Sequence, residues 1–149
     1  MNRLNQEQIT DAIITYATVH GLGKNKEYKK LHSLVCNASK QDRYFGLMGV
    51  FLRDLKAERL RVQTLAGRML LKITPKAMER CEEAVFRLLA NWDVSAEEVI
   101  LYLQSQFGDE SLLSAIVEME STAQDENDVA RLKIMKYWLG ISAHSEEEE

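Results

Sequence analysis

The sequence predicts an all-α protein of stacked antiparallel helix pairs, an arrangement known as an α-solenoid. Its 149 residues include one proline and seven glycines, too few for the many tight turns of a β-sandwich. Helix-forming residues such as Leu, Ala, Glu, Lys and Arg are abundant. Apolar residues recur at steps of three and four, the helical period, along most of the chain. The alternative is an irregular bundle of seven or eight helices.

The longest helical pattern covers residues 42–73 and is apolar over most of its circumference, which predicts burial on several sides. No proline interrupts it, and its two closely spaced glycines, Gly46 and Gly49, come early. It forms either one long helix or a hairpin broken near residues 55–58. We favour the hairpin, because globular helices average about 11–12 residues and because the break gives the helix starts a regular spacing.

Two helices are expected before this stretch, at Asn5–His20 and Lys24–Ala38, and the Gly-Leu-Gly segment between them ends the first. Ser39 stands three residues before Asp42, the spacing of a side-chain N-cap. These signals predict two capped helices that lead into the central pattern.

Thr74 and Pro75 follow the central pattern and predict the N-cap and first residue of a helix over 76–92. Ser95 and Glu98 have the Ser-x-x-Glu spacing of a capping box, which predicts that the next helix begins there.

The remaining boundaries carry glycine and aspartate. Gly108 ends one expected helix and Asp109 caps the next, while Asp125 opens a last helix that Gly140 ends. Residues 1–141 are expected to form one domain, and residues 142–149 a disordered acidic tail.

The expected helix starts recur along the chain. First helices begin near residues 5, 42, 76 and 110, and second helices near 24, 58, 95 and 126. A helix pair that repeats about every 34 residues is typical of α-solenoids.

Two segments carry a further pattern. Asp54 precedes Leu-Arg-Val at residues 60–62, and Asp125 precedes Val-Ala-Arg at residues 129–131. This resembles the second helices of the HEAT-like class of helical repeats. The resemblance implies stacked helix pairs whose second helices line a concave surface.

Residues suited to catalysis or metal binding are few and scattered. The chain has two cysteines, Cys36 and Cys81, each within an apolar helical pattern, which predicts reduced, buried, structural thiols. His20, His32 and His144 have no partner at metal-ligand spacing. We therefore expect no metal, no cofactor and no enzymatic activity.

Hydropathy predicts neither a membrane span nor a leader. No apolar run approaches the roughly 18 residues that cross a bilayer, and Met1–Glu7 lacks the apolar core of a signal peptide. We expect a cytoplasmic protein that makes no membrane contact.

Charge divides the chain into two unlike halves. Residues 1–76 hold 14 Lys and Arg against 6 Asp and Glu, a net charge of +8, whereas residues 77–149 hold 5 against 17, a net charge of −12. Such asymmetry often marks a binding face. The acidic counterpart could be nucleic acid, an acidic protein or the C-terminal half itself.

Three cations lie in a row on one side of the central pattern, at Arg61, Arg68 and Lys72, with apolar residues on both flanks. We call these three the basic row, and Arg53 and Lys56 extend it. The row predicts a basic groove that holds an acidic protein partner, so the protein is interpreted as a non-enzymatic adaptor. The alternative is nucleic-acid or phosphate-ligand binding through the basic N-terminal half, and a second copy of the chain is a further candidate partner.

Overall fold

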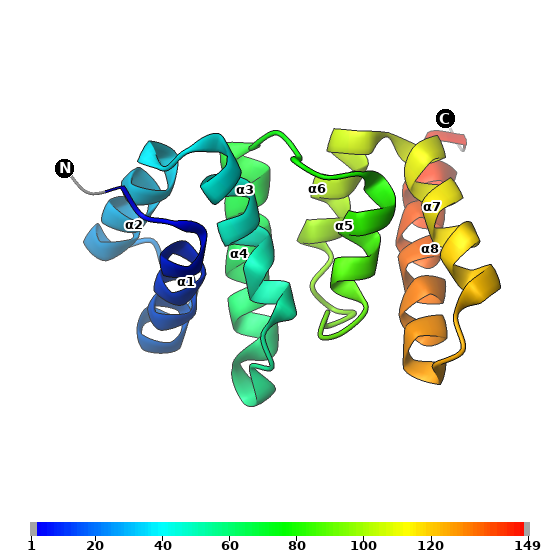
Figure 1. The fold of residues 1–149 in the computed structure, drawn as a ribbon, viewed down its shortest axis with the longest axis horizontal. Coiled ribbons are helices and arrows are strands. Elements are labelled where there is room, and N and C mark those ends of the chain that lie inside the picture. The colour runs from blue at the N-terminus through cyan, green and yellow to red at the C-terminus, as the bar shows by residue number, and fades with distance from the viewer. Residues whose placement is uncertain (1–2, 148–149) are drawn as a thin grey trace.

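The computed structural model describes residues 3–147, which contain eight α-helices, two short 3-10 helices and no strand (Figure 1). The chain is therefore all-α, as predicted. The helices are α1 (Gln6–His20), α2 (Lys26–Asn37), α3 (Lys40–Met48), α4 (Arg59–Ile73), α5 (Cys81–Leu88), α6 (Glu98–Phe107), α7 (Asp109–Thr122) and α8 (Glu126–Glu147).

Figure 1 shows the helices side by side along the longest axis, with α1 and α2 at one end and α7 and α8 at the other. Helix α1 packs on both α3 and α4, α4 packs on α6, and α5 packs on α7. This arrangement fits the irregular bundle that the sequence left as an alternative. Regular stacking of equivalent helix pairs is not confirmed and stays a prediction.

The central pattern is a helical hairpin, as we favoured. Helix α3 ends in the 3-10 turn η1 (Gly49–Leu52), and η2 (Lys56–Glu58) leads into α4. Lys56, the first residue of η2, has a φ of 51°, a left-handed conformation that one continuous α-helix through this position would not allow. The chain leaves the helical conformation at Arg53, two residues before the predicted break.

Several predicted helix starts are confirmed by side-chain hydrogen bonds to backbone amides. The Asn5 side chain accepts a bond from the Gln8 amide, and the Ser39 hydroxyl accepts one from the Asp42 amide. The Asp125 carboxylate accepts one from the Asn127 amide ahead of α8. These contacts satisfy amides that have no partner inside a helix.

Two predicted N-caps are wrong. Thr74 ends α4 in a left-handed conformation, with φ at 49°, and α5 begins only at Cys81. Ser95 is not the N-cap of α6, because α6 begins at Glu98 without a side-chain cap. The Ser95 amide instead donates a hydrogen bond to the Asp93 carboxylate.

The ends of the last helices also differ from the prediction in part. Gly108 ends α6 as expected, but it also serves as the N-cap position of α7, and Asp109 is the first residue of that helix. Gly140 lies within α8 and does not end it. Helix α8 runs to Glu147 and so takes in residues 142–147 of the predicted disordered tail. The side chains from residue 141 on, and residues 148–149 altogether, lie outside the described part of the structure, so the prediction of a tail is not tested there.

Two glycines allow neighbouring helices to approach closely. A Cβ on Gly46 of α3 would lie 2.6 Å from the Ile9 Cβ of α1, and a Cβ on Gly67 of α4 would lie 2.7 Å from the Glu98 Cβ of α6. Real Cβ atoms do not approach one another this closely. The α1–α3 and α4–α6 contacts therefore depend on glycine at these two positions.

Replacing Gly67 with alanine should lower the free energy of unfolding by about 1–3 kcal/mol, because α6 must move away from α4. Urea denaturation measures the loss. Gly140→Ala is the matched control, since a Cβ there meets nothing within 4 Å and alanine favours the helix. Equal effects of the two substitutions would contradict the close α4–α6 contact.

Neither cysteine forms a disulfide, as predicted. Cys81 is buried as predicted, but the predicted burial of Cys36 is wrong, because Cys36 is only half-buried, with its Sγ 3.7 Å from the His32 Nδ1. Burial and the nearby Glu82 raise the pKa of the Cys81 thiol from 9.0 to about 11. The Cys81 thiol therefore stays protonated near neutral pH, which suits a structural role.

The fold should lose stability at alkaline pH. Burial raises the pKa of Tyr44 and of Tyr102, as it does for Cys81, so all three hold their protons more tightly in the folded state. Their contribution is complete below the unfolded pKa values of about 9–10 and is lost as pH rises from that range towards the raised pKa values of the folded state. Urea midpoints at about pH 8 and pH 10.5 measure it, and a flat profile would contradict the burial of these groups.

Candidate functional site

The basic row is exposed on α4, but both of its arginines already have acidic partners within the chain. The Arg61 guanidinium lies 3.3 Å from the Glu58 carboxylate, and the Arg68 guanidinium lies 3.6 Å from Glu98. The Lys72 ammonium lies 5.8 Å from the centre of the Tyr28 ring, within cation–π range.

The two residues predicted to extend the row lie in the break before α4. Arg53 is 3.0 Å from the Asp11 carboxylate, and Lys56 is exposed with no carboxylate within 4 Å among the described residues. Exposed ion pairs contribute only about 0.2–1 kcal/mol each. An acidic partner could therefore displace the internal partners of Arg53, Arg61 and Arg68.

Some basic residues of the N-terminal half form ion pairs with acidic residues of the C-terminal half. Arg68 pairs with Glu98 across the α4–α6 contact, and Arg59 lies 3.3 Å from Asp93. Both pairs join the basic half of the chain to its acidic half. The C-terminal half is thus one of the acidic counterparts that the sequence left open.

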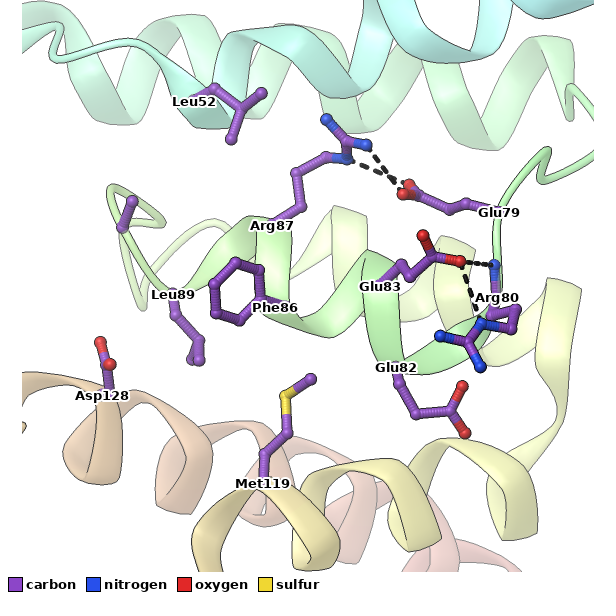
Figure 2. Close-up of a pocket in the computed structure, with 11 residues that line it drawn as sticks. Leu52, Glu79, Arg80, Glu82, Glu83, Phe86, Arg87, Leu89, Met119 and Asp128 are labelled. Carbon is purple, nitrogen blue, oxygen red and sulfur yellow. Dashed lines mark hydrogen bonds and ion pairs between the residues drawn. The ribbon is translucent and has the colours of Figure 1, made fainter. Parts of the chain in front are cut away.

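A groove of about 640 Å³ runs along the exposed side of α5, and we call it the α5 groove (Figure 2). Its walls come from η1, the segment before α5, and helices α7 and α8. Ligand pockets commonly enclose about 300–1,000 Å³. The apolar side chains that line it are Leu52, Phe86, Leu89, Ala90 and Met119.

Phe86 is the most unusual residue of the groove, because 68 % of this large apolar side chain is exposed. Helix α5 buries Cys81, Ala84, Val85 and Leu88 on its other side, which leaves Phe86 facing away from the core. Leu52 across the groove is also 49 % exposed. Exposed aromatic residues grouped with other apolar side chains often mark binding sites.

A buried ion pair holds one wall of the groove, and we call it the Glu79 network. The Arg87 guanidinium donates two hydrogen bonds to the Glu79 carboxylate, at 3.1 Å and 2.8 Å, and the Tyr44 hydroxyl donates a third at 2.6 Å. The Glu79 side chain is only 5 % exposed. The network ties α3, the segment before α5 and α5 itself together.

Tyr44 and Arg87 both stay protonated within the Glu79 network. Burial raises the pKa of Tyr44 far above its usual value of 10.0, and the hydrogen bond to Glu79 raises it further. The same carboxylate raises the pKa of Arg87. The phenol therefore remains a donor and the guanidinium remains charged, so the groove wall is fixed by charge-assisted bonds.

The carboxylates on the groove rim differ in their partners. Glu83 is paired with Arg80 at 3.1 Å, whereas Glu82 and Asp128 have no cation within 4 Å in the described structure. Two negative charges on the rim are therefore free to meet a ligand.

Sequence reasoning did not find this site. Apolar residues at helical spacing in α5, namely Cys81, Ala84, Val85 and Leu88, are buried, and Phe86 is the apolar residue outside that pattern. That departure was the available signal. Glu79 and Arg87 are eight residues apart and separated by a helix start, so no local pattern indicates their pairing.

The other predicted features give no second site. Among the residues whose side chains are described, 3–140, no group of three or more His, Cys, Asp or Glu could hold a metal ion. His20 lies in the last turn of α1, beside the Asn25 side chain. The described helices include none that is both long and apolar enough to span a membrane.

One of the two segments whose sequence resembles HEAT-like repeats makes a long-range contact. Arg131 donates hydrogen bonds to the carbonyls of Trp92 and Leu89, both at 2.9 Å, and so binds α8 to the end of α5. The Arg61 guanidinium, in the other segment, forms an ion pair with Glu58, three residues away.

No protein-family model, curated protein or solved structure matches this chain.

Proposed function

We propose that this protein is a non-enzymatic protein-binding module and that the α5 groove is its binding site. The observation that carries the proposal is the exposure of Phe86, 68 % of whose side chain faces the groove and solvent. Burying such a ring against a partner stabilises a complex by removing apolar surface from water.

The Glu79 network supports the proposal because it holds the groove wall in place before a partner binds. A groove wall held by three partly buried, charge-assisted hydrogen bonds loses little conformational freedom when a partner binds. Arg87 of the network lies on the same helix as Phe86, so the network holds this helix in place while Phe86 stays exposed.

Selection from a phage-displayed library of random peptides about four helical turns long tests the proposal. Selected peptides should bind the intact protein and bind Phe86→Asp at least about tenfold more weakly. Val19→Asp is the matched control, because Val19 is also 68 % exposed but lies on α1, outside the groove. Peptides that lose affinity equally for both variants, or for neither, would contradict the proposal.

A second candidate function is the binding of an acidic protein, a nucleic acid or a phosphate ligand by the basic half. One observation favours it: several exposed lysines have no carboxylate within 4 Å among the described residues, namely Lys24, Lys26, Lys29, Lys30 and Lys72. Lys24 and Lys72 both lie within 6 Å of the Tyr28 ring centre, which brings α2 and α4 together.

A gel shift with labelled nucleic acid at about 50 mM and 200 mM salt tests this candidate, since phosphate contacts weaken steeply with salt.

A further inference from the structure

The charges around the α5 groove indicate what kind of partner it fits. Each cation that lines the groove is already paired with a carboxylate, Arg87 with Glu79 and Arg80 with Glu83. Glu82 and Asp128 remain without a cation in the part of the chain that the structure describes. The groove therefore offers negative charge and apolar surface, but no unpaired positive charge.

The two unpaired carboxylates are placed on either side of the apolar surface. In Figure 2, Glu82 and Asp128 lie on opposite sides of Phe86 and Met119. Glu82 comes from α5 and Asp128 from the first turn of α8. A ligand that covers Phe86 thus has an acidic group near each of its ends.

The net charge of the surrounding half of the chain also favours a positively charged partner. Residues 77–149 carry a net charge of −12, with 17 Asp and Glu against 5 Lys and Arg. Such a field attracts cations over distances longer than one contact and speeds their association. An acidic segment would meet repulsion from this half as it approached the groove.

We infer that the α5 groove binds one face of a basic amphipathic helix of a partner protein. An apolar side chain of that helix packs on Phe86, and its flanking Lys or Arg side chains pair with Glu82 and Asp128. Grooves between helices commonly take such helices through anchors one or two turns apart. This inference rests on the proposed function and adds the chemistry of the partner to it.

Two synthetic helical peptides of about four turns test the inference. Both carry the same Leu and Phe residues on one face, and the polar face carries Lys in one peptide and Glu in the other. In fluorescence-polarisation titrations with the full chain, the Lys peptide should bind at least about tenfold more tightly than the Glu peptide at about 50 mM salt. The difference should shrink at high salt, where rim charges are screened.

Variants test whether Glu82 and Asp128 on the groove rim cause the preference for the Lys peptide. The double change Glu82→Lys and Asp128→Lys should weaken the Lys peptide by about tenfold or more. The matched control, Glu110→Lys with Glu118→Lys, alters net charge equally at exposed positions of α7 outside the groove. Equal weakening by the two double variants would overturn the inference, because only the overall field would then be involved.

The outcomes separate this inference from the proposed function. If both peptides bind equally and Phe86→Asp abolishes both, the groove binds proteins but its charge preference is overturned. Binding that does not depend on Phe86, or no binding by either peptide, overturns the inference together with its use of the groove. Sedimentation velocity without peptide tests whether a second copy of the chain occupies the groove. Self-association that Phe86→Asp abolishes would assign the groove to that second copy and overturn the inference.

Discussion

Glu79→Ala should lower the free energy of unfolding by about 3–5 kcal/mol, the loss expected when one partner of a buried ion pair is removed. The substitution leaves the Arg87 guanidinium and the Tyr44 hydroxyl without their acceptor, in a place where Tyr44 is fully buried. Because folded domains are stable by only about 5–15 kcal/mol, the effect is a large part of the total. Urea denaturation followed by circular dichroism measures it.

The matched control for Glu79→Ala is Asp11→Ala, which removes an ion pair of similar length in an exposed position. The Asp11–Arg53 pair spans 3.0 Å, with both side chains largely exposed, so its loss should cost about 0.2–1 kcal/mol. Similar losses for the two variants would show that the Glu79 network does not hold the fold together.

Trp92→Ala should cost about 3–5 kcal/mol, because it removes a fully buried aromatic side chain and leaves a cavity. The indole also donates a hydrogen bond of 2.9 Å to the Ala96 carbonyl, which shapes the turn before α6. The Trp92 carbonyl accepts a bond from Arg131, so movement of this turn also disturbs the contact with α8. Thermal and urea unfolding monitored by circular dichroism give the loss.

Trp138→Ala serves as the control for Trp92→Ala. Trp138 is only half-buried on α8, and its indole donates a longer bond of 3.2 Å to the Val94 carbonyl. Its replacement should cost clearly less. A larger loss at Trp138 than at Trp92 would contradict the placement of the core.

Helical periodicity predicted where helices exist, because every helix buries one face. The four apolar residues Ile9, Ile13, Tyr16 and Ala17 of α1 repeat at steps of three, four and one, and all four are buried. The hairpin of residues 42–73 was also predictable, since one long helix would have exceeded ordinary lengths.

The start of α5 was mispredicted because distant residues hold the preceding segment out of a helix. The Tyr102 hydroxyl donates to the Pro75 carbonyl, and the Gln106 side chain accepts a bond from the Ala77 amide. Both partners lie on α6, about 30 residues away in sequence. Local Thr-Pro chemistry could not reveal them.

The start of α6 was mispredicted for a similar reason. The buried Gln63 side chain donates a hydrogen bond of 2.8 Å to the Asn91 carbonyl and accepts one of 2.7 Å from the Asp93 amide. These two bonds fix the turn between α5 and α6. Ser95 lies within this turn and is not the cap that its spacing to Glu98 suggested.

The basic row was predictable as an exposed face, but its neutralisation was not. Helical spacing placed Arg61, Arg68 and Lys72 on the surface of α4, where all three lie. The partner of Arg68 comes from α6, 30 residues later, and only the folded chain brings Glu98 to it. The α5 groove was out of reach for the same reason, since five separate elements form its walls.

The central claim is that a partner segment binds in the α5 groove, and amide chemical-shift mapping tests it most directly. Titration of the isotope-labelled protein with the Lys peptide should shift amides of α5, of the Leu52 turn and of the facing parts of α7 and α8. The amides of α2 should stay unchanged. Shifts concentrated on α2 and the basic row, with none around Phe86, would contradict the account.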